Sequence, residues 1–143
     1  MTNTPVIADT GFWIALFNRT DIFHPQAVTA LSSLERRLVT TWPVMTETSH
    51  ILLRRGGQIT QQKFIAQWAS GHFDIFTLTQ MHAASVQSLM HKYADLPMDL
   101  ADASLVVLAN ELGHGDILTT DQRDFRTYRW KNRRPFRNVL LME

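Results

Sequence analysis

The 143-residue sequence contains no cysteine, which excludes disulfide bonds, thiolate nucleophiles and zinc sites built on thiolates. Carboxylates and six scattered histidines are the metal ligands that remain, so the composition favours a hard cation with oxygen ligands. The sequence also lacks an apolar run near the roughly 20 residues that span a bilayer. Its first residues lack the features of a signal peptide. We therefore expect residues 1–143 to form a single cytoplasmic domain without a membrane segment.

The positive and negative charges of the chain nearly cancel, which leaves a net charge of +1, but the basic residues are unevenly distributed. The segment 121–137 holds seven of the 14 Lys and Arg residues and two of the 13 acidic residues, which gives it a charge of +5. Such a segment is either a phosphate-binding surface or a solvated stretch whose arginines maintain solubility. On the first interpretation, the binding residues are Arg123, Arg126, Arg129, Lys131, Arg133 and Arg134.

Short apolar runs alternate with segments whose apolar residues recur at helical spacing. The runs predict strands at residues 4–8, 38–42, 73–78, 116–120 and 137–142. The periodic segments predict helices at residues 11–18, 25–37, 43–55, 58–70, 79–94 and 99–112. This alternation is typical of an α/β fold with a mainly parallel sheet. In such folds ligands bind outside the carboxyl ends of the strands.

Three acidic residues occur where predicted strands end. Asp9 and Asp121 follow strands directly, and Glu47 lies about one turn into the helix that follows the second strand. Each of these acids also has an ordinary structural interpretation. For any one acid considered by itself, that interpretation is the more common one. Asp9 can cap a helix, Asp121 can belong to a turn, and Glu47 can interact with a helix dipole.

Two further acidic residues open the helix that begins at MDLADASLVVLA. Asp99 fits the N-cap position and Asp102 the third helical position, where both can bind free backbone N–H groups. The residues after Asp102 are apolar on every face, so its carboxylate leaves the helix beside a dry surface and needs a partner.

Acidic residues from four separate elements are thus predicted at one edge of one sheet. Capping does not require such convergence, but a binding site does. Clustered carboxylates repel each other and are stabilised by a divalent cation. A site of carboxylates alone suits Mg²⁺ or Mn²⁺, and the chemistry that such ions support is phosphoryl transfer.

These segments resemble the PIN domain family, and within it the VapC-type ribonuclease toxins of bacterial toxin–antitoxin pairs. The resemblance runs through VIADTGFWIALF, TTWPVMTETSHIL and YADLPMDLADASLVVLANELGHGDILTTDQRDF, and the order and spacing of these motifs carry it. It implies a three-layer fold with a mainly parallel central sheet of four to five strands flanked by helices. Carried over, the family's catalytic and metal-binding acids fall on Asp9, Glu47, Asp102 and Asp121.

The resemblance implies supporting positions as well. Asp99 shares or supports the metal site, and Thr10 and Thr120 support the cluster, whereas Asp124 is a less favoured ligand. The implied activity is Mg²⁺- or Mn²⁺-dependent cleavage of RNA that leaves a 5′ phosphate, with no histidine base. The basic residues of segment 121–137 then contact the RNA.

The family resemblance also implies protein partners: a second copy in a homodimer, and a small antitoxin that lies in a groove over the acids. Several aromatic side chains either line such a groove or belong to the hydrophobic core. The core is the more common role for aromatic residues at helical spacing. These residues are Phe12, Trp13, Phe17, Trp42 and Trp68.

Three other functions remain open from the sequence. A PIN nuclease of RNA processing would have no antitoxin. A non-catalytic RNA-binding or regulatory module would use the acids as helix caps and bind through the basic segment, with steep salt dependence. A phosphoacceptor receiver domain is least favoured, because it needs a lysine directly after a late strand. The first lysine after the strand predicted at 116–120 is Lys131.

Overall fold

The computed structural model describes residues 4–141, and its centre is a five-stranded parallel sheet. The strands are β1 (Val6–Ala8), β2 (Leu38–Thr41), β3 (Phe73–Phe76), β4 (Asp116–Leu118) and β7 (Arg137–Asn138). Their order is β3-β2-β1-β4-β7, and every neighbouring pair is parallel, which confirms the predicted sheet. From β1 the chain passes to β2 on one side and later to β4 on the other. The carboxyl ends of β1 and β4 therefore flank a topological switch point, where ligands bind in open parallel sheets.

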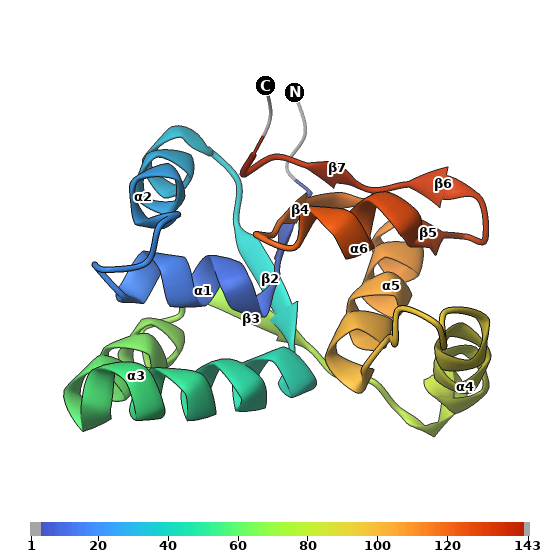
Figure 1. The fold of residues 1–143 in the computed structure, drawn as a ribbon, viewed down its shortest axis with the longest axis horizontal. Coiled ribbons are helices and arrows are strands. Elements are labelled where there is room, and N and C mark those ends of the chain that lie inside the picture. Colours follow the sequence, from blue (N-terminus) through green and yellow to red (C-terminus); the bar gives the residue numbers. More distant parts are fainter. Residues whose placement is uncertain (1–3, 142–143) are drawn as a thin grey trace.

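Helices cover both faces of the sheet, as the three-layer prediction requires (Figure 1). On one side lie α1 (Thr10–Phe17), α2 (His24–Ser33) and α3 (Trp42–Ala69), with α1 in contact with both others. On the other side α4 (Ala83–Lys92) contacts α5 (Leu100–Leu112). None of the helices within residues 4–141 combines the length and the apolar character that crossing a bilayer demands.

Helix α5 is deeply buried, because every residue from 103 to 109 belongs to the interior. Its N-cap is Asp99 and its C-cap is Gly113, whose φ of 76° is readily adopted only by glycine. Both boundaries agree with the sequence prediction. The burial also confirms that Asp102, at the start of this helix, lies against a dry interior.

Several predicted boundaries were wrong. The helix predicted to reach residue 37 ends at Ser33, and Arg36 and Arg37 instead pair with Asp116 and Asp74, each at 2.9 Å. The predicted helices at 43–55 and 58–70 form one element, α3, with a kink at Gly57 where φ is 85°.

Smaller shifts occur at the ends of other elements. The second strand ends one residue early, since Trp42 already belongs to α3, and the fourth ends at Leu118. The segment predicted as a helix from residue 79 begins with a short 3₁₀ turn, η1 (Gln80–His82), before α4. Met142, the last residue of the strand predicted at 137–142, lies outside the described residues.

The sequence patterns predicted no helix or strand for residues 121–136 of the basic segment, and this was wrong. This segment forms α6 (Gln122–Thr127) and an antiparallel hairpin of β5 (Arg129–Trp130) and β6 (Arg134–Pro135). The turn residues Lys131 and Asn132 have φ of 46° and 65°, a conformation unusual for residues other than glycine. The side-chain oxygen of Asn110 on α5 accepts a 2.6 Å hydrogen bond from Lys131 N and holds this turn. A contact from a distant helix leaves no local sequence signal, which explains the missed hairpin.

The aromatic residues divide between core and surface. Phe12 and Trp13 are buried, in keeping with the core interpretation. Trp42 and Trp68 are 42% and 39% exposed and contact each other edge to face at 5.3 Å. An aromatic surface thus lies on α3 close to Glu47, which is five residues after Trp42, where this helix begins after β2.

Candidate active site

Asp9 stands at the carboxyl end of β1 and is almost fully buried, with 6% of its surface exposed. Its Oδ1 accepts a 2.7 Å hydrogen bond from Thr10 N at the start of α1, so it does cap that helix. Its Oδ2 accepts a 2.8 Å hydrogen bond from the Thr119 hydroxyl. Burial raises the pKa of Asp9 to about 6, against the lowering effect of these two hydrogen bonds. The charges of Asp121 and Glu47 raise this pKa further, so both lie within electrostatic reach of Asp9.

Thr119 joins the ends of β1 and β4. The same hydroxyl that donates to Asp9 accepts a 2.9 Å hydrogen bond from Asp121 N. A backbone bond of 3.0 Å from Asp9 N to Leu118 O runs beside it. The next residue, Thr120, was a predicted supporting threonine, but its hydroxyl oxygen occupies the space that a side chain at Gly11 would need. Both threonines follow the end of β4 at Leu118, so only the folded chain shows which of the two adjacent residues contacts the acids.

Asp121 caps α6 and accepts a 3.2 Å hydrogen bond from Asp124 N. One carboxylate oxygen each of Asp102, Asp121 and Asp124 lies within 4.8 Å of the other two. This geometry includes Asp124, which the sequence analysis ranked below the other acids. Its position follows from α6, because a residue three places after the N-cap lies in the same turn. Burial first, and then the neighbouring Asp124, raise the pKa of Asp121.

Asp102 lies at the start of α5 and is held by Tyr128. Its backbone N–H donates to Asp99 Oδ1 at 2.8 Å, and its own Oδ2 accepts a 2.8 Å hydrogen bond from the Tyr128 hydroxyl. Burial, followed by the charge of Asp9, raises the pKa of Asp102 to about 8. Burial and the bond to Asp102 raise the pKa of Tyr128 above its ordinary value, so the phenol is a donor at neutral pH. Sequence reasoning missed Tyr128, because no local pattern relates it to Asp102.

The remaining predicted acids flank this group. Asp99 is exposed and acts as the N-cap of α5, and its charge contributes to the raised pKa of Asp102. Glu47, on α3, is half-buried. Both residues line a groove of about 650 Å³ with Trp42, His50 and Leu100. The structure therefore brings the five predicted acids, together with Asp124, to the carboxyl edge of the sheet.

The predicted binding arginines are in different environments. Arg123, Arg126 and Arg133 are exposed, and Arg123 lies 3.4 Å from Asp124. Arg129 instead donates from Nη1 to the carbonyl oxygens of Arg126, Thr127 and Tyr128 at 2.7–3.3 Å, at the end of α6. Arg134 stacks over the Trp130 ring at 5.5 Å.

The donor set at the edge of the sheet fits a divalent cation. The oxygens of Asp102, Asp121 and Asp124 lie close enough for shared coordination, and the pKa values of Asp102 and Asp121 are raised. The buried hydroxyl of Thr10, beside Asp9, meets no hydrogen-bond partner among the described residues. All these donors are oxygen atoms, as Mg²⁺ and Mn²⁺ prefer.

A family model of the PIN domain matches residues 6–131 of this chain. The chain belongs to the PIN domain family. The family resemblance inferred from the motifs is thereby confirmed.

Two mycobacterial proteins are similar to this PIN domain. Ribonuclease VapC26 of Mycobacterium tuberculosis (strain ATCC 25618 / H37Rv) is 26% identical over 124 residues, which cover 87% of this chain and 92% of that protein. The crystal structure of Mycobacterium tuberculosis VapC20, described as a sarcin–ricin loop cleaving toxin, has a TM-score of 0.77 to this structure at 21% identity. The match covers 82% of this chain and 91% of VapC20, and at this identity it concerns the fold.

The raised pKa of Asp102 predicts a pH-dependent stability of the metal-free protein. Between its unfolded value of 3.8 and its folded value of about 8, the folded state holds a proton that the unfolded chain has lost. Stability therefore falls as pH rises through this window. In EDTA, Asp102→Asn should raise the melting temperature by several degrees at pH 8, at roughly 4 °C per kcal/mol, and by much less at pH 5, which is near the lower end of this window.

Asp95→Asn serves as the control, because Asp95 is exposed in the turn before α5. It should leave the melting temperature nearly unchanged at both pH values. A shift for Asp102→Asn that is equal at pH 5 and pH 8 would show that charge at Asp102 does not destabilise the fold.

Proposed function

We propose that this PIN domain is a divalent-metal-dependent endoribonuclease that hydrolyses phosphodiester bonds in RNA. The observation that carries the proposal is the carboxylate group of Asp102, Asp121 and Asp124, with Asp9 buried beside it, at the switch point of the sheet. The family membership and the similarity to Ribonuclease VapC26 support the same function.

The residues that would hold Mg²⁺ or Mn²⁺ are Asp102 and Asp121, with Asp9, Glu47, Asp99 and Asp124 around them. Bound there, such an ion supplies an activated water and stabilises the charge on the phosphate and the leaving oxygen. The protein supplies orientation: the Thr119 hydroxyl holds Asp9 and the backbone of Asp121 in one arrangement. Thr10, next to Asp9, supports the cluster through its buried hydroxyl, and Thr120 does so through its packing over Gly11.

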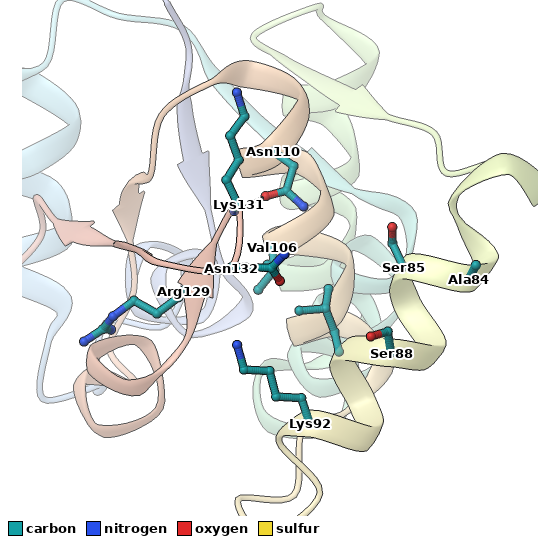
Figure 2. Close-up of a pocket in the computed structure, with 10 residues that line it drawn as sticks. Ala84, Ser85, Ser88, Lys92, Val106, Asn110, Arg129, Lys131 and Asn132 are labelled. Atoms are coloured by element: carbon teal, nitrogen blue, oxygen red, sulfur yellow. Dashed lines mark hydrogen bonds between the residues drawn. The ribbon is translucent and has the colours of Figure 1, made fainter.

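The RNA backbone would follow α6 and the hairpin β5–β6, away from the acids. The exposed cations on this path are Arg123, Arg126, Lys131, Arg133 and Arg134. A pocket of about 310 Å³ continues it between α4, α5 and the hairpin turn, and no acidic residue lines it. Figure 2 shows Lys92 directed from α4 toward the hairpin, whereas Arg129 extends away from α4. Lys92 thus joins Lys131 as a cation at this pocket, while Arg129 contributes mainly by fixing the end of α6.

Two protein partners complete the proposal, a small antitoxin and a second copy of this chain. The names of VapC26 and VapC20, a ribonuclease and a toxin, support a toxin–antitoxin pair. The groove beside Glu47 and Asp99 would receive the antitoxin, because it is lined both by these acids and by the exposed aromatic side chain of Trp42. A nuclease of RNA processing would have the same site and no antitoxin.

The proposed homodimer would use the apolar groove between η1, α4 and the start of α5. This groove has a volume of about 580 Å³ and is lined by Leu78, Val86, Met90 and Leu100 among others. Leu100 is 50% exposed and also lines the groove beside Glu47, so it is an accessible apolar residue shared by the two grooves.

The nuclease activity is tested by incubating total RNA with purified protein in Mn²⁺ or Mg²⁺, and in EDTA. Asp9→Asn or Asp121→Asn should abolish cleavage and leave the fold intact or more stable, since a repelling charge is removed. Asn is as good a helix cap as Asp, so these variants separate metal binding from capping. Induced expression of the parent, but not of Asp121→Asn, should arrest bacterial growth if the chain is a toxin.

Asp95→Asn, prepared identically, should cut as fast as the parent and controls for contaminating nucleases. If Asp121→Asn also cuts at the parent rate, the assignment of the site is wrong. RNA binding without cutting, indifferent to EDTA, would instead support the non-catalytic binding module.

The basic surface is tested by RNA binding as a function of salt in EDTA. Arg126→Gln should weaken binding and reduce the slope of log K against log salt by about 0.7, the value expected for one lost phosphate contact on a single strand. Arg55→Gln, an exposed arginine on α3, is the matched control and should change neither quantity. Equal effects of the two variants would mean that α6 is not part of the binding surface.

The dimer is tested by light scattering, where the parent should have about twice the chain mass of 16.4 kDa. Leu100→Glu should yield monomers, because it places a charge in the apolar surface at a helical position that tolerates an acid. Ile22→Glu changes a residue that is 80% exposed outside this surface and should remain dimeric. A parent that is monomeric at high concentration would refute the homodimer.

A further inference from the structure

Tyr128 is fully buried at the end of α6, and its hydroxyl donates a 2.8 Å hydrogen bond to Asp102 Oδ2. The bond joins two elements that are 26 residues apart in the sequence and that each carry acids of the proposed site. It occupies one oxygen of Asp102. The other oxygen, Oδ1, has no hydrogen-bond donor among the described residues.

The ring of Tyr128 is held on two sides, which fixes the direction of its hydroxyl. Phe125 contacts it edge to face at 5.1 Å and Tyr93 does so at 5.0 Å. The backbone N–H of Tyr128 donates to Asp124 O at 2.9 Å. The hydroxyl is therefore attached to the same short helix that carries Asp121 and Asp124, and its position relative to those acids is set by α6 itself.

A phenol suits this position because it is a donor without charge. An arginine or lysine in its place would orient Asp102 equally well, but it would also neutralise the carboxylate and compete with a cation. A neutral donor orients one oxygen and leaves the negative charge available. The hydroxyl of Thr119 has the same relation to Oδ2 of Asp9, so two of the buried acids are oriented by neutral hydroxyl donors.

We propose that Tyr128 is a positioning residue of the metal site. Its hydroxyl holds Asp102 Oδ2 so that the other oxygen of Asp102 faces the carboxylates of Asp121 and Asp124, and the affinity of this group for a divalent cation depends on that orientation. The inference rests on the proposed function, because it requires that these acids bind a cation. Removing a residue that orients a metal ligand typically lowers the affinity for the metal by roughly 10- to 100-fold.

The test is a titration of purified protein with Mn²⁺, with the free ion measured by electron paramagnetic resonance at constant pH. Tyr128→Phe keeps the buried ring and removes the hydroxyl, and it should weaken Mn²⁺ binding about 10-fold or more. Tyr93→Phe is the matched control. Its hydroxyl accepts a 3.1 Å hydrogen bond from Arg129 N and contacts no acid of the site, so the affinity should stay at the parent value.

A double-mutant cycle separates positioning from a general loss of structure. In an Asp102→Ala background, Tyr128→Phe should leave the residual Mn²⁺ affinity unchanged, because the group that it orients is absent. Circular dichroism and the melting temperature of each variant establish that it is folded at the temperature of the titration.

The outcomes distinguish the inference from the function on which it rests. A parent protein that binds no Mn²⁺ would refute the metal-dependent nuclease itself. A parent that binds Mn²⁺, with Tyr128→Phe at the same affinity, would overturn the role of Tyr128 and leave the nuclease proposal intact. An equal loss of affinity with and without Asp102 would also overturn it, because Tyr128 would then not act through Asp102.

Discussion

Repulsion among carboxylates that the sheet brings to one edge is the constraint on which this structure depends. Burial and mutual charge raise the pKa of Asp9 to about 6 and that of Asp102 to about 8, so the folded chain tolerates these acids at a cost. The rest of the fold makes the arrangement possible: β1 and β4 are adjacent at the switch point, and the buried helix α5 brings Asp102 to them. A bound divalent cation would neutralise these carboxylates and remove the repulsion between them.

Capping and site formation are not alternatives in this molecule. Asp9, Asp99 and Asp121 each accept a hydrogen bond at the N-terminus of a helix, as the structural interpretation of each acid required. Because the capped helices α1, α5 and α6 all begin at the same edge of the sheet, the caps are also neighbours. A cap fixes its carboxylate by a backbone hydrogen bond, and this makes the acids rigid before any ligand binds.

The hydroxyl groups around the acids form a second set of constraints. Thr119 fixes Asp9 relative to Asp121, and Tyr128 fixes Asp102 relative to α6. Both donors are buried and neutral, so they orient carboxylates without cancelling their charge. The basic residues lie on the exposed face of α6, the helix that also carries Asp124, and on a hairpin whose turn is held by Asn110. The hydroxyl groups that orient the acids are buried, whereas the cations that could contact a polyanion are exposed on the same helix and on the adjacent hairpin.

The sequence by itself determined the class of the fold, the family and the acids that follow strands and open helices. These features depend on local patterns: apolar runs, helical periodicity and the position of an acid relative to them. Tertiary structure alone decided that Thr119 rather than Thr120 contacts Asp9, that Asp124 joins Asp102 and Asp121, and that Tyr128 binds Asp102. It also decided that segment 121–137 folds into α6 and a hairpin. The physical reason is that these outcomes arise from contacts between residues distant in sequence, whose partners are chosen by packing and leave no periodic or compositional signal in the chain.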